Sequence, residues 1–544
     1  MRKLAALLFT PLFLCAAPPD DSVQAAARAI TSEGLLAHIR TLASDEFGGR
    51  APGTEGERKT VDYLIEQAKK LGLKPGNPNG TYIQQVPLWS IRSSGSLKLS
   101  VQSREIELAP DQDFFLTSNL PKPEIEIAKA PLVFVGYGVD APEYKWNDYK
   151  HVDVKGKIVV LLSGDPPVAD PSDPSKLDEK MFLGKALSYY GRPSSKYDVA
   201  FKHGALACIT VYTPRAGANL SRMAQNMPRE VMIINDASAA QHVGAQVFLT
   251  AEKTSELLTA AGQELSALRT AAAKPDFQPV PLSAFASLEI KNDLRAINSP
   301  NVITQIPGSD PKLRNEYVIY SGHWDHVGTQ GDRIYHGASD NAAGTAGVLE
   351  LARAFTQLHP APRRTVLFLW PTAEEKGLLG ARYYVLHQLY PLSKTVADIN
   401  LDYFSNWGWG RTRDISIIGI GNSSLDDLVK AAAEKQGRIV TGDTDPEEGF
   451  FFRSDHLEFE MAGVPSLETS PGIEHIGKPP GFGVQKRDEY IRNDYHKPSD
   501  QIKPDWDLRG SVEDLQILFE VGCQVAQSDA RPVWRQRAPY LRLD

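Results

Sequence analysis

The segment Tyr317–Glu350, YVIYSGHWDHVGTQGDRIYHGASDNAAGTAGVLE, joins a short apolar run to a polar loop and then to a helix-like segment. The apolar run ends in Gly322-His323-Trp324-Asp325, and the loop delivers Asp340 just before the helical pattern that begins near Gly344. A histidine at a strand end and a carboxylate at a helix start suit a divalent metal, because rigid backbone holds both at one edge of a sheet. The stretch therefore predicts a metal site.

Short apolar runs and helical segments alternate from Phe285 onward. Uninterrupted apolar runs such as Val366–Trp370 are expected when helices cover both faces of a sheet. The fold class predicted is α/β, with a mixed, largely parallel sheet flanked by helices. The expected strands are residues 301–306, 316–320, 365–370, 396–401 and 414–418, and the expected helices between them are residues 344–358, 378–389 and 425–435.

The chain of 544 residues is too long for one ordinary core, so more than one domain is expected. Between about residues 121 and 279, strand candidates alternate with Pro- and Gly-rich loops, and no His, Asp or Glu residues group at metal-ligand spacing. This block predicts an inserted β-rich domain without chemistry of its own. The predicted division is 27–112 and 281–530 for the catalytic domain and 113–280 for the insertion.

The N-terminus has the pattern of an export signal, with a basic start, an apolar core and small residues near Cys15, so residues 1–17 are predicted to be a signal peptide. The protein is expected to be periplasmic or extracellular, with a lipid anchor through Cys15 as an alternative. The apolar run is too short for a transmembrane helix. The net charge of −8 and the lack of a basic face argue against a nucleic-acid partner. Cys208 and Cys523 are expected to be buried and not to act as ligands.

Further candidate ligands follow other predicted strands. Glu374-Glu375 follows one strand, Asp402 ends another, and His496 lies in a late loop. Imidazoles and carboxylates together suit zinc better than calcium. These candidates exceed what one tetrahedral zinc with an open position needs, so two zinc ions sharing a bridging carboxylate are expected. One glutamate of the doublet would bind metal, and its neighbour would move the proton of a bridging water.

Several motifs resemble those of peptidase family M28, the co-catalytic zinc exopeptidases, and in particular members with a protease-associated (PA) domain. The resemblance implies that His323, Asp340 and Asp402 bind one zinc and that Asp340, Glu375 and His496 bind the other. It also implies that Glu374 is the general base and that Asp325 orients His323. Asp340 is additionally expected to cap the following helix. The matching segments are SGHWDHVG, GASDNAAGTAG, TAEEKGLLGA, NLD, RSDHLEFEMAGVP and YHKPSD.

An exported aminopeptidase acting on peptides is therefore the leading hypothesis. Aromatic residues near the motifs (Phe450–Phe452, Trp407, Trp409 and Tyr495) are expected to form an apolar pocket. A carboxypeptidase of the same fold would need arginines that converge on a carboxylate, for which Arg411, Arg413 and Arg453 are candidates. Two further hypotheses are a glutaminyl-cyclase-like enzyme with a single zinc and a receptor-like protein without catalysis. His326, His336 and His456 receive no role, because the ligand set of the family is already complete.

Overall fold

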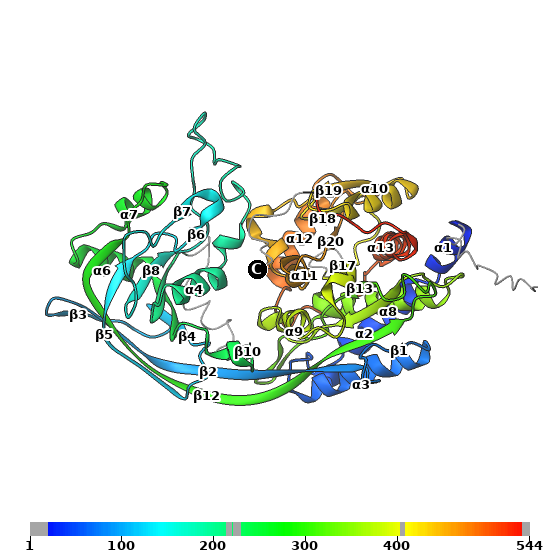
Figure 1. Ribbon diagram of the computed structural model, residues 1–544, viewed down its shortest axis with the longest axis horizontal. Coiled ribbons are helices and arrows are strands. Elements are labelled where there is room, and N and C mark those ends of the chain that lie inside the picture. The colour runs from blue at the N-terminus through cyan, green and yellow to red at the C-terminus, as the bar shows by residue number, and fades with distance from the viewer. Residues whose placement is uncertain (1–19, 214–219, 221–229, 403–407, 536–544) are drawn as a thin grey trace, which may run out of the picture.

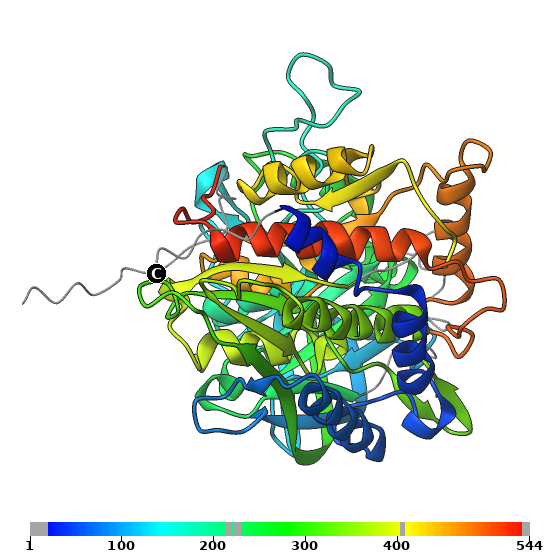
Figure 2. The same ribbon diagram turned by 90° about the vertical axis from the view of Figure 1, so that its right-hand side faces the viewer.

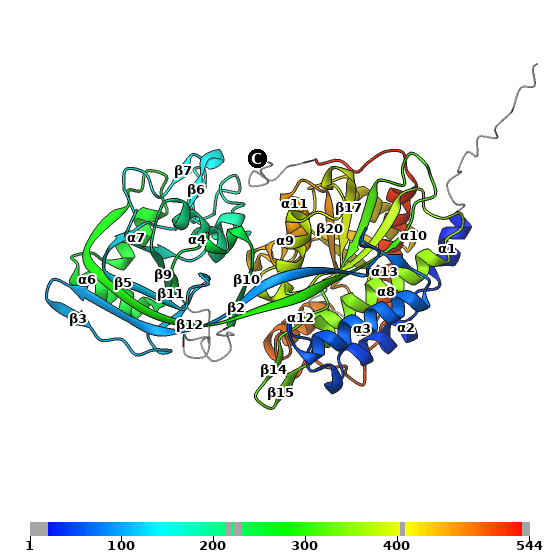
Figure 3. The same ribbon diagram turned by 60° about the horizontal axis from the view of Figure 1, so that its bottom comes forward.

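Two long antiparallel strands tie the molecule together. The computed structural model describes residues 20–213, 220, 230–402 and 408–535. Strand β2 (Ile83–Val101) pairs with β12 (Val280–Ile306) continuously from Ile83 opposite Val302 to Val101 opposite Ala284. Both strands run between two lobes, as Figures 1 and 3 show. We call residues 95–290 the inserted lobe and the other described residues the main lobe.

The main lobe is built on a mixed, largely parallel sheet. Its strands are ordered β19-β18-β20-β17-β13-β16-β12. The pairs β13/β16, β13/β17, β17/β20 and β18/β19 are parallel, whereas β12/β16 and β18/β20 are antiparallel. The strand bounds are β13 Tyr317–Ser321, β16 Thr365–Trp370, β17 Thr395–Asn400, β18 Asp414–Ile418, β19 Ile439–Gly442 and β20 Ser466–Pro471.

Helices cover both faces of this sheet, which explains its uninterrupted apolar strands. On one face, Val318 and Phe368 pack with α1, α2, α3, α8, α10 and α13 in a large core. On the other, Ile319 and Leu367 pack against α9 and α11. Figure 2 shows α13 and α8 lying side by side over the first face. The bounds are α1 Asp20–Ala27, α2 Ser32–Leu42, α3 Glu55–Lys70, α8 Gly344–Thr356, α9 Leu379–Leu386, α10 Leu425–Lys435, α11 His456–Met461, α12 Phe482–Asn493 and α13 Arg509–Gln527.

The inserted lobe continues the sheet from the other end of β12. There β12 pairs with β5, and the order runs β5-β8-β9-β11-β4, with parallel pairs from β5 to β11. Strand β10 pairs with β2 where the lobes meet. The bounds are β3 Arg104–Ile106, β4 Phe114–Thr117, β5 Glu124–Phe134, β8 Ile158–Leu162, β9 Ala207–Tyr212, β10 Glu230–Ile234, β11 Ala245–Thr250, α4 Pro193–Lys202, α6 Ala251–Ala260 and α7 Leu265–Ala272.

The predicted fold class is confirmed by the central sheet and its flanking helices. The exact domain division stays a prediction, because β2 and β12 run through the junction without a break. Leu97 and Leu99, placed before the predicted boundary at residue 113, pack in the core of the inserted lobe. Strands β19 and β20 and residues 280–300 of β12 were not predicted.

Two further expectations concern the N-terminus and membranes. The predicted signal peptide, including Cys15, lies outside the described residues. Among the described residues, no helix has both the length and the apolar character needed to cross a membrane.

Candidate metal centre

Three parallel strands bring the first site residues to one edge of the sheet. Tyr320 in β13 lies opposite Phe368 in β16 and Ile399 in β17. The three strands therefore end level with one another, and His323, Glu374 and Asp402 follow in the loops beyond them. This shared register explains how residues so far apart in the sequence meet.

A first cluster forms around the imidazole of His323. Its Nε2 atom lies 3.5 Å from Asp340 Oδ1 and 3.4 Å from Asp402 Oδ1. All three side chains are buried, and their ligand atoms lie within 4.8 Å of one another. The structure thus places these three predicted ligands around one point.

A second cluster shares Asp340 with the first. The Nε2 atom of His496 lies 3.0 Å from Asp340 Oδ2 and 3.0 Å from Glu375 Oε2. Asp340 therefore directs one oxygen at His323 and the other at His496. This is the arrangement that a bridging carboxylate requires, and it brings together every residue predicted as a ligand.

His326 also belongs to the second cluster, although no role was predicted for it. Its Nδ1 atom lies 2.7 Å from Glu375 Oε1, and its ring packs edge-on against His496. His326, Asp340 and Glu375 offer ligand atoms within 4.8 Å of one another. The spacing HWDH was a signal for it, because the second histidine lies in the same loop as the first.

The two adjacent glutamates experience opposite electrostatic environments. Burial raises the pKa of Glu374 well above its usual range, and the charge of His323 offsets this only in part. Burial acts in the same direction on Glu375, but the charges of His496 and His326 outweigh it and hold the pKa of Glu375 well below its usual range. The two neighbouring carboxyls therefore differ in how readily each holds a proton.

Asp325 connects His323 with Glu374. His323 Nδ1 lies 3.1 Å from the Asp325 carbonyl oxygen and 3.7 Å from its carboxylate. The same carboxylate accepts a hydrogen bond of 3.0 Å from the backbone N–H of Glu374. Asp325 is thus in contact with His323, which it was expected to orient, and also with Glu374, for which no such contact was predicted.

A buried arginine fixes the loops that carry the clusters. Arg50, fully buried, donates hydrogen bonds to the carbonyl oxygens of Trp324, His336 and Gly337. Burial lowers the pKa of Arg50 to about 10, against the attraction of nearby carboxylates. This role was not predicted, because the partners of Arg50 are backbone groups far away in the chain.

The helix after Asp340 is capped by a different residue from the one predicted. Asn341 Oδ1 accepts a hydrogen bond of 2.9 Å from the N–H of Gly344, at the start of α8. The carboxylate of Asp340 instead faces the two histidines, while its own backbone N–H donates to Asp500. The expectation that Asp340 caps the helix was wrong, because its neighbour satisfies the free N–H groups.

The donor set fits divalent cations. Buried carboxylates of Asp340, Glu374, Glu375 and Asp402 share a small volume, and like charges this close are costly without cations between them. Neither carboxylate oxygen of fully buried Asp455 has a hydrogen-bond partner in the described chain, and burial raises its pKa well above the usual range. Mixed imidazole and carboxylate ligands favour zinc.

Comparison with known proteins relates this part of the chain to a family. Residues 301–519, about two-fifths of the chain, match the model of peptidase family M28. The protein is accordingly a zinc-dependent hydrolase of the metallopeptidase class.

Relatives that match over most of the chain are also named as peptidases. The probable leucine aminopeptidase 2 of Aspergillus oryzae is 26% identical over 438 residues, which cover 79% of this chain and 69% of that protein. The probable lipoprotein aminopeptidase LpqL of Mycobacterium tuberculosis is 23% identical over 494 residues, covering 87% and 81%. An aminopeptidase structure from Aneurinibacillus sp. strain AM-1 superposes with a TM-score of 0.52 at 20% identity, covering 95% of this chain and 98% of that one, and shows the shared fold.

The single apolar pocket that the aromatic residues near the motifs were expected to form is only partly present. Tyr495 stacks on His496 with ring centroids 3.9 Å apart, and Phe450 lines a pocket beside Asp402. Phe452 is instead buried against Leu378, and Trp409 lines a different hollow. Trp407 lies outside the described residues. The aromatic residues therefore serve separate purposes, which sequence proximity could not reveal.

One of the three candidate arginines, Arg453, lies near the metal centre. Arg453 donates to the hydroxyl of Tyr495 at 2.8 Å and stabilises charge on Glu374. Arg411 is exposed and pairs with Glu513 at 2.6 Å. Arg413 is exposed at the surface. The described residues do not show the convergent arginines that a site for a C-terminal carboxylate needs.

Proposed function

We propose that this protein is an exported di-zinc aminopeptidase that removes N-terminal residues from peptides. The observation that carries the proposal is the position of Asp340, whose two carboxylate oxygens face two separate ligand clusters. A single-zinc cyclase would need only one such cluster. A receptor-like protein would have no use for a buried group of facing carboxylates.

The first zinc would be held by His323, Asp340 and Asp402, and the second by Asp340, Glu375 and His496. His496 is favoured over His326 for the second zinc because its Nε2 lies 3.0 Å from both carboxylates of that cluster. His326 contacts only the far oxygen of Glu375 closely, at 2.7 Å. It would therefore orient Glu375 from outside the ligand set, as hydrogen-bonded partners of metal ligands commonly do.

Glu374 would move the proton. When bound, the zinc pair would lower the pKa of a shared water and polarise the scissile carbonyl. The Glu374 carboxylate, 3.8 Å from His323 Nε2, would take the proton of the attacking water and deliver it to the leaving amine. The hydrogen bond from its backbone N–H to Asp325 would hold it in position.

The site supports an aminopeptidase over a carboxypeptidase. A C-terminal carboxylate would need arginines that converge on it, and the residues described around the site do not show them. The two relatives that match over most of the chain, from Aspergillus oryzae and Mycobacterium tuberculosis, both carry the name aminopeptidase.

Export rests on the sequence of residues 1–17, and the inserted lobe is proposed to be a PA domain. The lipoprotein relative supports export and keeps the anchor through Cys15 as an alternative. Mass spectrometry of the mature N-terminus would separate the two, since a lipidated Cys15 would be the first residue of the anchored form.

A substrate comparison with metal counting tests the catalytic proposal. The zinc-loaded full chain should hydrolyse a leucine anilide with a free amine and leave an N-acetylated dipeptide intact. Zinc analysis should give two ions per chain. Cleavage of the blocked dipeptide alone would establish a carboxypeptidase, and one zinc per chain with no hydrolysis would support a cyclase.

A further inference from the structure

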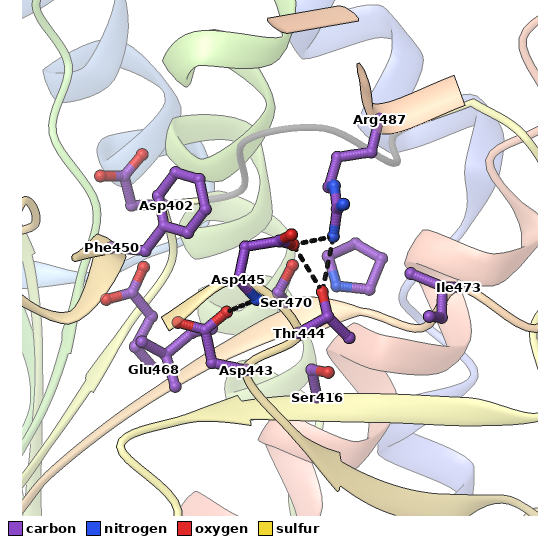
Figure 4. A pocket seen from close by; sticks show the side chains of 12 residues that line it. Asp402, Ser416, Asp443, Thr444, Asp445, Phe450, Glu468, Ser470, Ile473 and Arg487 are labelled. Carbon is purple, nitrogen blue, oxygen red and sulfur yellow. Dashed lines mark hydrogen bonds and ion pairs between the residues drawn. The ribbon is translucent and has the colours of Figure 1, made fainter. Parts of the chain in front are cut away.

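A pocket in the main lobe begins at Asp402 and leads away from the metal centre. Figure 4 shows Asp402 and Phe450 at one side of this pocket and Arg487 of α12 at the other. Because Asp402 belongs to the first cluster, a group bound by that cluster has direct access to the pocket. The walls are contributed by the ends of β18 and β20, the segment after β19, and α12.

The walls combine apolar and acidic groups. Ile418, Phe450 and Ile473 supply apolar surface. Asp443, Asp445 and Glu468 supply carboxylates. An aliphatic stem with a cationic end would satisfy both kinds of surface, because lysine and arginine bury their methylene groups while the charged head meets polar partners.

Apart from Asp402, which belongs to the first cluster, the pocket has three carboxylates, and cations of the protein pair with two of them. Arg487 forms an ion pair with Asp445 and also donates to Thr444, as Figure 4 shows. Glu468 Oε2 lies 2.5 Å from Nδ1 of His456. The pKa of buried His456 is raised to about 9, because the attraction of Glu468 outweighs the effect of burial.

Asp443 is the carboxylate left over. It accepts a hydrogen bond of 2.9 Å from the backbone N–H of Asp445, and no cation of the described chain forms an ion pair with it. Burial raises the pKa of Asp443, which a cation brought beside it would reverse. Asp443 is thus the carboxylate of these three with which no cation of the described chain forms an ion pair.

We propose that this pocket receives the side chain of the substrate's N-terminal residue and that Asp443 makes the enzyme prefer lysine and arginine there. The inference rests on the proposed aminopeptidase function. It adds the substrate class: peptides with a basic first residue. Asp443 is a specificity-determining residue in this scheme, since it contacts the side chain and not the reacting atoms.

The test compares substrates that differ only in the terminal charge. The zinc-loaded full chain is assayed with lysine and norleucine anilides. Both side chains have the same four-carbon chain, and only that of lysine ends in an ammonium group. We expect kcat/KM for lysine to exceed that for norleucine by about tenfold or more. Asp443→Asn should lower kcat/KM for lysine about tenfold and leave norleucine unchanged, because asparagine keeps the acceptor for the Asp445 N–H but not the charge.

Controls separate this inference from the function on which it rests. Asp62→Asn removes the same charge at an exposed ion pair on α3 and should change neither substrate. Norleucine turnover by Asp443→Asn shows that the variant is folded and active. Equal turnover of lysine and norleucine by the wild type, or an equal loss for both in Asp443→Asn, would overturn the inference while leaving the aminopeptidase intact. Failure to hydrolyse any free-amine substrate would instead overturn the proposed function.

Discussion

A buried carboxylate of the inserted lobe and those of the metal centre have opposite environments. In the inserted lobe, Asp148 accepts hydrogen bonds from the N–H groups of Tyr137 and Val139 and from the indole of Trp146, at 2.8–3.1 Å. In the metal centre, buried carboxylates face one another and imidazoles, and neighbouring Asp455 accepts no hydrogen bond from the described chain. A carboxylate that the chain itself satisfies serves the architecture. A group of carboxylates that it leaves facing one another is prepared for a ligand.

The largest effect that the comparison predicts is at Glu374. Glu374→Gln keeps the size of the side chain and removes its ability to take a proton, so kcat should fall by about 10²–10⁴-fold. Zinc content measured by atomic emission should stay at the wild-type value, because Glu374 is not in the proposed ligand set. The matched change Glu256→Gln, at an exposed ion pair in the inserted lobe, should leave kcat unaltered. Undiminished turnover by Glu374→Gln would exclude it as the base.

The shared position of Asp340 predicts a difference in zinc content between two variants. Asp340→Asn weakens both clusters and should lower the content below one zinc per chain. His496→Ala affects only the second cluster and should leave about one. Zinc counting after gel filtration measures both. Equal zinc content in the two variants would contradict a bridging role for Asp340.

Zinc removal should separate the lobes in hydrogen exchange. Chelation leaves the carboxylates of the main lobe facing one another, so amide exchange should speed up in residues 321–326 and 372–376. Amides of β8 in the inserted lobe should exchange at the same rate with and without zinc. Loss of protection of similar size in β8 would show that the lobes depend on the metal together.

Asp148 predicts a pH effect on stability without an effect on catalysis. Burial raises its pKa from 3.8 to about 6, so its favourable contribution is present below about pH 4 and is lost as the pH rises through 6. Between pH 4 and 6, the free energy of unfolding of the wild type should fall relative to Asp148→Asn by up to about 3 kcal/mol. Denaturant unfolding at both pH values measures this. A pH-independent difference, or a lower kcat/KM in the folded variant at pH 7, would contradict a purely architectural role.

The smallest predicted effect is at a contact between the lobes. Lys185 of the inserted lobe pairs with Glu447 at 2.7 Å, and the lysine is largely exposed. Exposed ion pairs contribute about 0–1 kcal/mol, so Lys185→Ala should leave both the melting temperature and kcat/KM close to the wild type. A marked loss of activity would show that this pair holds the lobes in a functional arrangement.

Sequence reasoning predicted five strands of the main lobe, and candidate ligands that the fold brings close together, because each has a local signal. The run Thr365–Trp370 is apolar throughout, and His323, Glu375 and Asp402 follow such runs. The length of β12 escaped prediction because Asn292, Asp293 and Pro300 interrupt its alternation of polar and apolar residues, as loop residues would. Arg50 escaped for another reason, because its partners are loop carbonyls brought near by tertiary contacts that no sequence spacing encodes. His326 lay beside His323 in the HWDH spacing, but its contact with Glu375 forms only in the folded chain.

The unbroken pairing of β2 with β12 has a consequence for protein engineering. Ser94 lies directly opposite Lys291, so the chain enters and leaves the inserted lobe side by side. Deleting residues 95–290 and closing the gap with a tight Asn-Gly turn would turn two crossing strands into an ordinary β-hairpin. Joining the chain at Ser94 and Lys291 would make the protein about a third shorter. It would keep every pairing between strands that lie within the main lobe.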